Sequence, residues 1–198
     1  PAQLKNIDYI TMSSTGNGID FGDLSVAKTS GASFSSPTRA FAFGGNLKPD
    51  TKQDVIDHLT IATTGDAVDF GNLHAAIELG GSAGSDTRGI SAGGGLQPDT
   101  KINVIDYITM ASLGDASDFG DLIAASYSMN SSNSGNISRG IFGGGGYPYT
   151  DVIQYITIAS TGNATDFGDL LTILNNSGGC SNSHGGLSDA YAVSLNTV

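Results

Sequence analysis

The sequence predicts an all-β protein assembled from four tandem repeats, and three observations support this. Two short motifs each occur four times, at spacings of 49, 49 and 48 residues; the first begins at Ile7, Ile56, Ile105 and Ile153, and the second at Asp20, Asp69, Asp118 and Asp166. No long segment keeps the apolar period of a helix. Glycine accounts for 29 of the 198 residues, which further disfavours helices. Motifs that recur in one phase indicate a repeat architecture.

Each repeat is expected to contain about four short strands. The segment Ile7–Met12 alternates in polarity and is rich in β-branched residues, which is typical of a strand. Arg39–Phe43 has the same character and ends at a glycine pair, and the block Asp20–Leu24 opens a further strand. The intervening Ser25–Ser36 fits a strand and a turn better than a helix. A repeat of about 45–50 residues with four strands is typical of a β-propeller blade.

Each end of the chain carries half a repeat. The chain begins with the third- and fourth-strand motifs, and it ends with Asp189–Val193, which is similar to Arg39–Phe43. We therefore expect one domain over residues 1–198, a four-bladed propeller closed by pairing of the N-terminal and C-terminal half-blades. Pairing between chains is the alternative, and it would give a larger ring or an open filament. The repeats are 7–55, 56–104, 105–152 and 153–198.

The repeats resemble those of the kelch family, in which a glycine pair ends the second strand and an aromatic residue opens the fourth. The glycine pairs here are Gly44-Gly45, Gly94-Gly95 and Gly143-Gly144. The third-strand motifs are Ile56-Asp57-His58, Ile105-Asp106-Tyr107 and Ile153-Gln154-Tyr155. Phe70, Phe119 and Phe167 stand where kelch repeats usually have Trp. Because the chain has no Trp, the resemblance implies a kelch-like propeller and not a typical member.

The Asp-Phe-Gly-Asp-Leu repeats also look like those of tandem-repeat virion proteins of phages, including tail-fibre-like proteins. This resemblance covers the whole chain and implies a non-enzymatic structural or adhesive component, of tail-fibre or capsid-decoration type, that serves host attachment. It implies a location in the virion or outside the cell, with other copies of the chain and other virion proteins as partners. Small polar side chains lose little entropy on assembly, which suits this function. A glycan-binding, lectin-like propeller that contacts host-surface glycans is the alternative, and a glycan hydrolase or lyase is a third.

Charge and cysteine content exclude several classes of function. The chain has 8 basic and 19 acidic residues and a net charge of −11, whereas nucleic-acid binding needs clustered Lys and Arg. The same acidity argues against an anionic membrane surface. No segment approaches the ~20 apolar residues that membrane insertion needs. Cys180 is the single cysteine, so neither an intrachain disulfide nor a Cys-based zinc site is expected.

The three arginines occupy one repeat position, at Arg39, Arg88 and Arg139. We expect each to hold its blade together by contacting an aspartate and loop carbonyls, because the guanidinium fork suits such contacts. The candidate aspartates are either Asp57 and Asp106 or the repeated acids Asp20, Asp69, Asp118 and Asp166. A ring of cations that binds an anionic ligand is the alternative.

The repeated phenylalanines and acids are also assigned structural roles. Phe21, Phe70, Phe119 and Phe167 are expected to pack between neighbouring blades, where each contributes roughly 2–3 kcal/mol; stacking on a sugar is the alternative. Carboxylates three residues apart in the Asp-Phe-Gly-Asp blocks are candidate Ca²⁺ ligands. However, Asn72 replaces one of them, and Asp and Gly are common turn residues. We therefore expect no metal and no cofactor, and Ca²⁺ is the alternative.

Residues of the types that commonly act in catalysis are few and form no recurrent set, so the chain is not expected to be an enzyme. His58, His74 and His184 lie at different repeat phases, and Cys180 lies four residues before His184 in a loop-like segment. The candidate residues for contact with a ligand or partner lie in the segments that break the repeat, because Tyr in a Ser- and Asn-rich loop is a common binding-surface composition. They are Tyr127, Tyr147, Tyr149 and His184.

Overall fold

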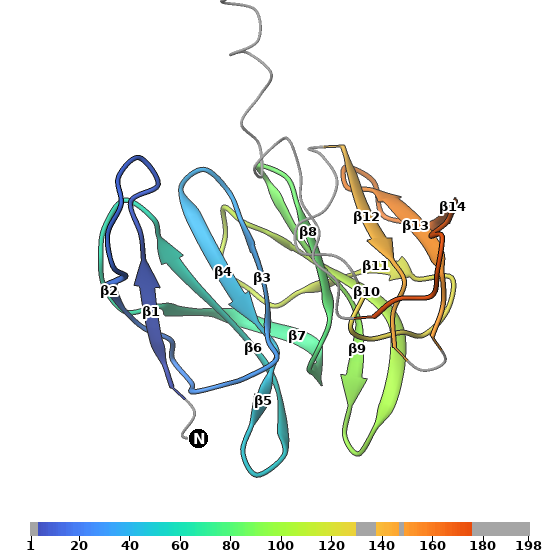
Figure 1. The fold of residues 1–198 in the computed structure, drawn as a ribbon, viewed down its shortest axis with the longest axis horizontal. Helices are drawn as coiled ribbons and strands as arrows, with labels where there is room; N and C mark the ends of the chain where they lie inside the picture. Colours follow the sequence, from blue (N-terminus) through green and yellow to red (C-terminus); the bar gives the residue numbers. More distant parts are fainter. Residues whose placement is uncertain (1–3, 130–137, 147–148, 176–198) are drawn as a thin grey trace, which may run out of the picture.

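The computed structural model describes residues 4–129, 138–146 and 149–175, and every regular element within these ranges is a β-strand. The strands form four antiparallel sheets, shown in Figure 1. The all-β, antiparallel architecture expected from the sequence is therefore confirmed. In the described part of the chain there is no helix long and apolar enough to cross a membrane.

The sheets follow the repeats along the chain. The first pairs β1 (Asn6–Tyr9) with β2 (Ile19–Asp23). The second has the order β3-β4-β6-β7, and the short β5 pairs antiparallel with the start of β6: β3 (Ala32–Ser35), β4 (Arg39–Phe43), β5 (Asn46–Leu47), β6 (Thr51–Thr60) and β7 (Val68–Ile77). The third has the order β8-β9-β10-β11: β8 (Gly81–Gly84), β9 (Arg88–Leu96), β10 (Thr100–Thr109) and β11 (Ser117–Asp121). The fourth contains β12 (Arg139–Gly143), β13 (Val152–Thr157) and β14 (Thr165–Asp169).

The last two strands of every sheet are joined through the same β-bulge. The register shifts in each pair, for example between Ile56 and Asp57 opposite Gly71. The glycine of each Asp-Phe-Gly block lies at the bulge with a positive φ between 140° and 150°, at Gly22, Gly71, Gly120 and Gly168. Bulges favour glycine because it adopts such conformations without steric cost. This is the physical reason for the repeated glycine.

The glycine pairs after the second strands bind the end of the fourth strand of the same sheet, or the segment just after it. Gly44 and Gly45 have φ values of 59° and 105°, and the Gly45 amide donates to the carbonyl of Ile77, 2.7 Å away, at the end of β7. The equivalent bonds run from Gly94 to Ser126 and from Gly145 to Leu174. The pairs are thus Gly93-Gly94 and Gly144-Gly145, each shifted by one residue from the positions predicted from the sequence. The hydrogen bonds of these glycines show which residues of each glycine run are equivalent to Gly44 and Gly45, and the sequence of a glycine run does not reveal this.

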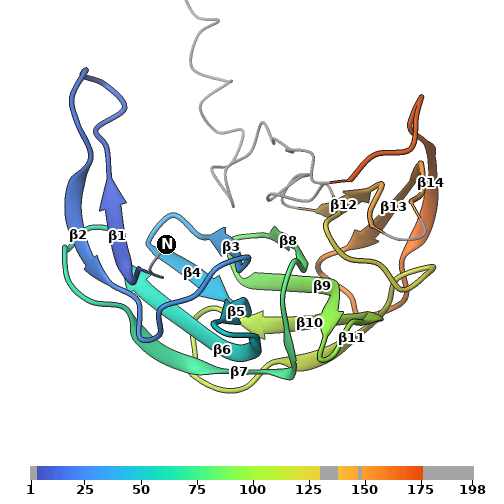
Figure 2. The ribbon, with the colours of Figure 1, turned by 60° about the horizontal axis from the view of Figure 1, so that its bottom comes forward.

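The four sheets follow one another around an open arc, as Figure 2 shows. The strands β3 and β8 lie on its concave side, and β2, β7, β11 and β14 lie on its outer side. The sheet of β1 and β2 forms one end, and the sheet of β12, β13 and β14 forms the other. The described residues do not form a closed ring, so the four-bladed propeller stays a prediction. Asp189–Val193, on which the predicted closure depends, lies outside the described residues.

The hydrophobic core lies mainly between successive sheets. One buried cluster joins Phe41 and Phe70 of the second sheet to Ile108 and Met110 at the end of β10. A second cluster joins the third sheet to the fourth; it includes Ile90, Ile105, Phe119, Phe142, Ile156 and Ile158. Burial of these side chains between the sheets is what fixes the sheets relative to one another.

Candidate functional site

One junction between neighbouring sheets recurs three times, and we take it as the candidate functional site. In each copy, the outer strand of one sheet receives a loop from the next sheet, through residues 64–67, 113–116 or 161–164. The loop glycine donates its amide to the carbonyl of the repeated Phe, and the loop alanine donates to the carbonyl two residues further on. The bonds are Gly65 to Phe21 and Ala67 to Asp23, Gly114 to Phe70 and Ala116 to Asn72, and Gly162 to Phe119 and Ala164 to Asp121, all between 2.7 and 3.0 Å.

A side chain in each loop completes the junction. The Asp66 carboxylate accepts the amide of Asp23 at 3.0 Å. Asp115 accepts the amide of Asn72 at 2.9 Å, and the Asn163 amide oxygen accepts the amide of Asp121 at 3.0 Å. Asp and Asn thus serve equally at this position, because each offers an oxygen acceptor.

The bulge glycines lie directly against these loops. A Cβ atom added to Gly22 would lie 2.3 Å from the Gly65 carbonyl oxygen, and one on Gly71 would lie 2.4 Å from that of Gly114. At Gly120 the distance to the Gly162 oxygen would be 2.6 Å. Glycine is therefore needed at these positions for close approach of the next sheet as well as for the positive φ.

The arginines also bridge neighbouring sheets. Nη1 of Arg39 donates to the Met110 carbonyl at 2.7 Å, and Nη1 of Arg88 donates to the Ile158 carbonyl at 2.9 Å. Carbonyl partners are therefore found as expected, but they belong to the next sheet and not to the arginine's own blade. The expected aspartate partners of Arg39 and Arg88 are not among the ion pairs of the described residues. Asp57 and Asp106 are buried with other partners, which makes them unavailable.

Two arginines also stack on tyrosines of their own sheets. The guanidinium of Arg88 lies 4.7 Å from the ring centroid of Tyr107, and that of Arg139 lies 4.5 Å from the ring centroid of Tyr155. These cation–π contacts hold each guanidinium in a defined orientation. Arg139 is thereby oriented as Arg88 is, although it belongs to the last described sheet.

The polar residue of the third-strand motif links the same sheets in a second way. Asp106 accepts the backbone amide of His74 at 3.2 Å, and its carboxylate lies 2.5 Å from the His74 Nδ1 atom. These contacts raise the pKa of His74 above its ordinary value. At the equivalent position of the fourth sheet, Gln154 accepts the amide of Ile123 at 2.9 Å.

Asp57, at this same repeat position, is instead part of a buried ion pair. Its Oδ2 atom lies 3.3 Å from Nζ of Lys28, and the two side chains are 0% and 4% exposed. Burial lowers the pKa of Lys28, and the Asp57 carboxylate opposes that change. The pair connects the segment after the first sheet to the second sheet.

The acids that open the Asp-Phe-Gly blocks cap their own bulges. The carboxylates of Asp69, Asp118 and Asp166 accept the amides of Gly71, Gly120 and Gly168 at 3.1, 3.2 and 3.1 Å. They contact neither Arg39 nor Arg88 among the described ion pairs. The part of the chain that the structure describes contains no group of three His, Cys, Asp or Glu residues placed to hold a metal ion.

A further polar cluster joins the hairpin of β5 and β6 to neighbouring segments. Lys52 contacts the carboxylates of Asp50 and Glu78, and Gln97 donates to Asp50 at 2.8 Å. Hydrogen bonds from Gln97, Asn46 and Lys52 lower the pKa of Asp50. Because these groups satisfy one another, the cluster is structural.

The repeated phenylalanines are buried wherever a following sheet is described. Phe70 and Phe119 are 3% and 2% exposed and belong to the two inter-sheet clusters, and Phe21 is 9% exposed. Phe167, on β14, is 54% exposed. The exposure of Phe167 thus marks the end of the arc.

Of the four predicted contact residues, Tyr127 and Tyr149 lie in the described part of the chain, and they have different surroundings. Tyr127 lines a cavity of about 180 Å³ with Glu78 and Asp99, while Tyr149 is 52% exposed in the connection between β12 and β13. Tyr147, Cys180 and His184 lie outside the described residues. A larger cavity of about 400 Å³, lined in part by Ser33, Ser35, Ser82, Phe34 and Met129, lies against the inner strands β3 and β8.

The loops 64–67, 113–116 and 161–164 were not among the residues singled out from the sequence. Their signal is present, because a Gly-Asp-Ala or Gly-Asn-Ala triplet starts four residues before the Asp of each later Asp-Phe-Gly block. A turn-like triplet looks like an ordinary connection until its hydrogen bonds to the preceding sheet are known. No protein-family model matches the chain, and no curated protein shows significant similarity to it. The functional argument therefore rests on the geometry of the junction.

Proposed function

We propose that this chain is a non-enzymatic structural protein that acts through protein–protein contacts and self-assembly. The observation that supports this is the junction described above, which joins successive sheets three times with the same hydrogen bonds. A modular interface of this kind can be extended by adding sheets of the same design. The polar, glycine-rich surface, with few long charged side chains, also suits lateral packing.

We further propose that the chain is a virion component of phage tail-fibre or capsid-decoration type, located in the virion or outside the cell, with other virion proteins as partners. This part rests on the resemblance of the Asp-Phe-Gly-Asp-Leu repeats and on the acidic charge, which disfavours nucleic acid and anionic membrane surfaces as partners.

The sheets are proposed to be kelch-like propeller blades, with the first sheet as a half-blade. In the other sheets the strand equivalent to β1 pairs with a preceding strand, as β6 does with β4, β10 with β9 and β13 with β12. Among the described residues β1 pairs with β2 alone. An apolar cavity of about 270 Å³ beside β1, lined in part by Ile7, Leu24 and Leu59, has room for a few side chains of the strands that would complete the blade.

A four-bladed ring closed by Asp189–Val193 is one way to complete this blade, but the chemistry of the glycine pair counts against it. In that alignment Ser194 and Leu195 replace Gly44 and Gly45. A Cβ atom at Gly44 would lie 2.7 Å from the Ile77 carbonyl oxygen, and one at Gly45 would lie 2.8 Å from that of Thr29. Completion of half-blades between chains is the other way.

Light scattering over a hundredfold range of protein concentration, with negative-stain images of the same samples, tests the proposal. Self-assembly predicts a mass that rises with concentration and regular rings or filaments. A constant mass near the 20.1 kDa of one chain would contradict it.

A glycan-binding function is the second candidate, and the cavity of about 400 Å³ on β3 and β8 favours it, because three serines are among the residues that line that cavity. A glycan array identifies a ligand, and Ser33→Ala with Ser82→Ala should then reduce binding without changing the mass. Tyr149→Ala tests the separate, half-exposed tyrosine in the same way.

A further inference from the structure

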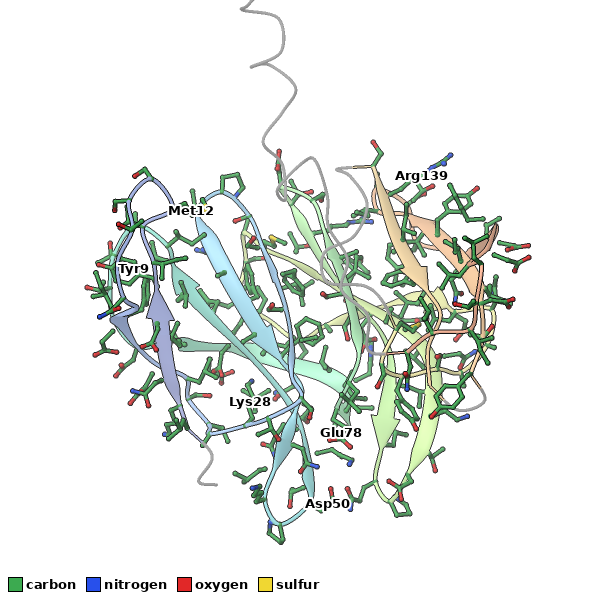
Figure 3. All side chains as sticks on the ribbon, viewed as in Figure 1. Tyr9, Met12, Lys28, Asp50, Glu78 and Arg139 are labelled. Atoms are coloured by element: carbon green, nitrogen blue, oxygen red, sulfur yellow. The ribbon has the colours of Figure 1, made fainter. Side chains whose placement is uncertain are left out.

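We infer that the loop of residues 15–18 in one copy binds the outer edge of β14 in a second copy, so that the junction within the chain also joins copies head to tail. This inference rests on the proposed self-assembly and identifies its surface. Figure 3 shows Met12, beside this loop, and Arg139, in the sheet of β14, at opposite ends of the molecule. The two ends therefore carry the two halves of one further junction.

The loop has the groups that the inner junctions use. Thr15-Gly16-Asn17-Gly18 corresponds to Thr161-Gly162-Asn163-Ala164, which docks on β11. The amides of Gly16 and Gly18 are the equivalent donors, and the side-chain oxygen of Asn17 is the equivalent acceptor. Among the described residues, the hydrogen bonds of the three inner junctions use the loops 64–67, 113–116 and 161–164, and the loop 15–18 docks on none of the described outer strands.

The edge of β14 has the complementary groups. By position, the carbonyls of Phe167 and Asp169 are the acceptors and the Asp169 amide is the donor. Gly168 has a φ of 140°, close to the 144° of Gly120, so the bulge has the shape found in the inner junctions. A Cβ atom at Gly168 would meet no atom of the described residues within 4 Å, which leaves room for the incoming loop. The pairing of Asn17 with Asp169 would repeat that of Asn163 with Asp121.

The arginine position extends the same pattern. Arg39 and Arg88 each donate to the carbonyl that follows the third-strand motif of the next sheet. At the equivalent position the first sheet has Met12, so Arg139 of one copy would reach the Met12 carbonyl of the other. Met12 is 96% exposed, whereas its equivalents Met110 and Ile158 are 3% and 1% exposed.

The apolar surface agrees with this contact. Of the fourteen exposed large apolar side chains of the described residues, ten lie in the first or fourth sheet or beside them, which places most of the uncovered apolar surface at the two ends. The end formed by the first sheet carries Ile10 and Met12, and the end formed by the fourth sheet carries Phe167 and Leu171. Large uncovered apolar patches mark interaction sites, so each end is suited to cover the other.

A second copy fits this contact better than the same chain does. The three inner junctions share their hydrogen bonds, yet after three of them the arc is still open, with the end sheets on opposite sides of the opening (Figure 2). Contact within one chain would require these packed junctions to rearrange together. A second copy needs no such change, and a head-to-tail contact of this kind yields rings or filaments.

Cysteine cross-linking between chains tests the inference. All variants carry Cys180→Ser, so that the engineered thiols are the only ones. Asn17→Cys and Asp169→Cys are made on separate chains, mixed, and treated with a short bis-maleimide; peptide mapping should find a dimer linked from 17 to 169. The matched control is one chain with Asp23→Cys and Asp66→Cys, which should link internally because these residues meet in the first junction.

The outcomes separate the inference from the proposed function. If the control links and the mixture gives no 17–169 dimer, the inference is overturned, and a mass that still rises with concentration leaves self-assembly intact through another surface. A link that forms when both cysteines are on one chain, but not in the mixture, overturns it in favour of ring closure within one chain.

Two exposed substitutions give an independent readout. Asn17→Ala removes the acceptor and should weaken association about tenfold. Asn17→Asp keeps an acceptor, as Asp66 and Asp115 do in the inner junctions, and should retain association. Equal effects of the two substitutions would contradict the proposed role of Asn17.

Discussion

Substitution of Gly71 by alanine should break the junction between the second and third sheets. The new Cβ atom would lie 2.4 Å from the Gly114 carbonyl oxygen and 2.9 Å from the Asp115 amide nitrogen. Both atoms are backbone, so the third sheet has to move away. Overpacking of this kind costs typically about 1–3 kcal/mol. Loss of the bonds from Gly114 to Phe70 and from Ala116 to Asn72 adds about 2 kcal/mol.

Gly168→Ala is the matched control for this effect. Gly168 lies at the same repeat position with a φ of 140°, against 150° for Gly71, so both substitutions impose similar backbone strain. No atom of the described residues lies within 4 Å of the added Cβ at Gly168. The difference in unfolding free energy between the two variants should therefore be about 3–5 kcal/mol, with Gly71→Ala the less stable.

Urea unfolding followed by circular dichroism, at protein concentrations low enough to suppress association, measures this difference. With a urea dependence of about 2 kcal/mol per molar, the midpoint of Gly71→Ala should lie about 2 M below that of Gly168→Ala. If the two variants unfold within about 0.5 M of each other, the sheet contact is not what requires glycine at Gly71.

Three further outcomes are expected. Phe70→Ala should cost about 3–5 kcal/mol of unfolding free energy, whereas Phe167→Ala, at an exposed position, should cost below about 1 kcal/mol; equal losses would contradict the packing role of this repeat position. Arg88→Ala should cost about 1–3 kcal/mol, because its bond to the next sheet and its stacking on a tyrosine are lost; calorimetry at one pH measures it. The raised pKa of His74 means that protonation of this residue favours the folded state, and this contribution is present below pH 6.5 and is lost as the pH rises through the raised pKa. The wild type and His74→Asn should therefore differ in unfolding free energy more at acidic pH than at pH 9, and a pH-independent difference would refute the pairing with Asp106.

The arginine position shows how much of a residue's role can be predicted from its recurrence in the sequence. Its occurrence at Arg39, Arg88 and Arg139 predicts that the residue does the same thing in every sheet, and Arg39 and Arg88 do bind equivalent carbonyls. The identity of the acceptor was not predictable, because it lies about 70 residues away in the chain. Aspartates looked suitable by charge, yet His74 and Lys28 contact them in the fold.

The acids of the third-strand motif show that equivalent sequence positions can have different contacts. Asp57 and Asp106 are equivalent in sequence, and the repeat predicts equal surroundings for them. In the structure Asp106 accepts the amide of His74, whereas Asp57 pairs with Lys28. Lys28 lies eight residues after the Asp that opens its Asp-Phe-Gly block and His74 lies five residues after its own, so the two partners come from different repeat positions, which the third-strand motif does not record.

The sequence by itself determined the periodicity, the all-β character and the strand positions, because these depend on local alternation, β-branched residues and glycine spacing. Only the tertiary structure decided what joins the sheets: the loops 64–67, 113–116 and 161–164 on the preceding outer strands, and the arginines on the carbonyls of the next sheet. It also decided that the described sheets form an open arc (Figure 2). Such contacts depend on the angle between packed sheets, which is set by the volume of the buried side chains and by hydrogen bonds between distant segments.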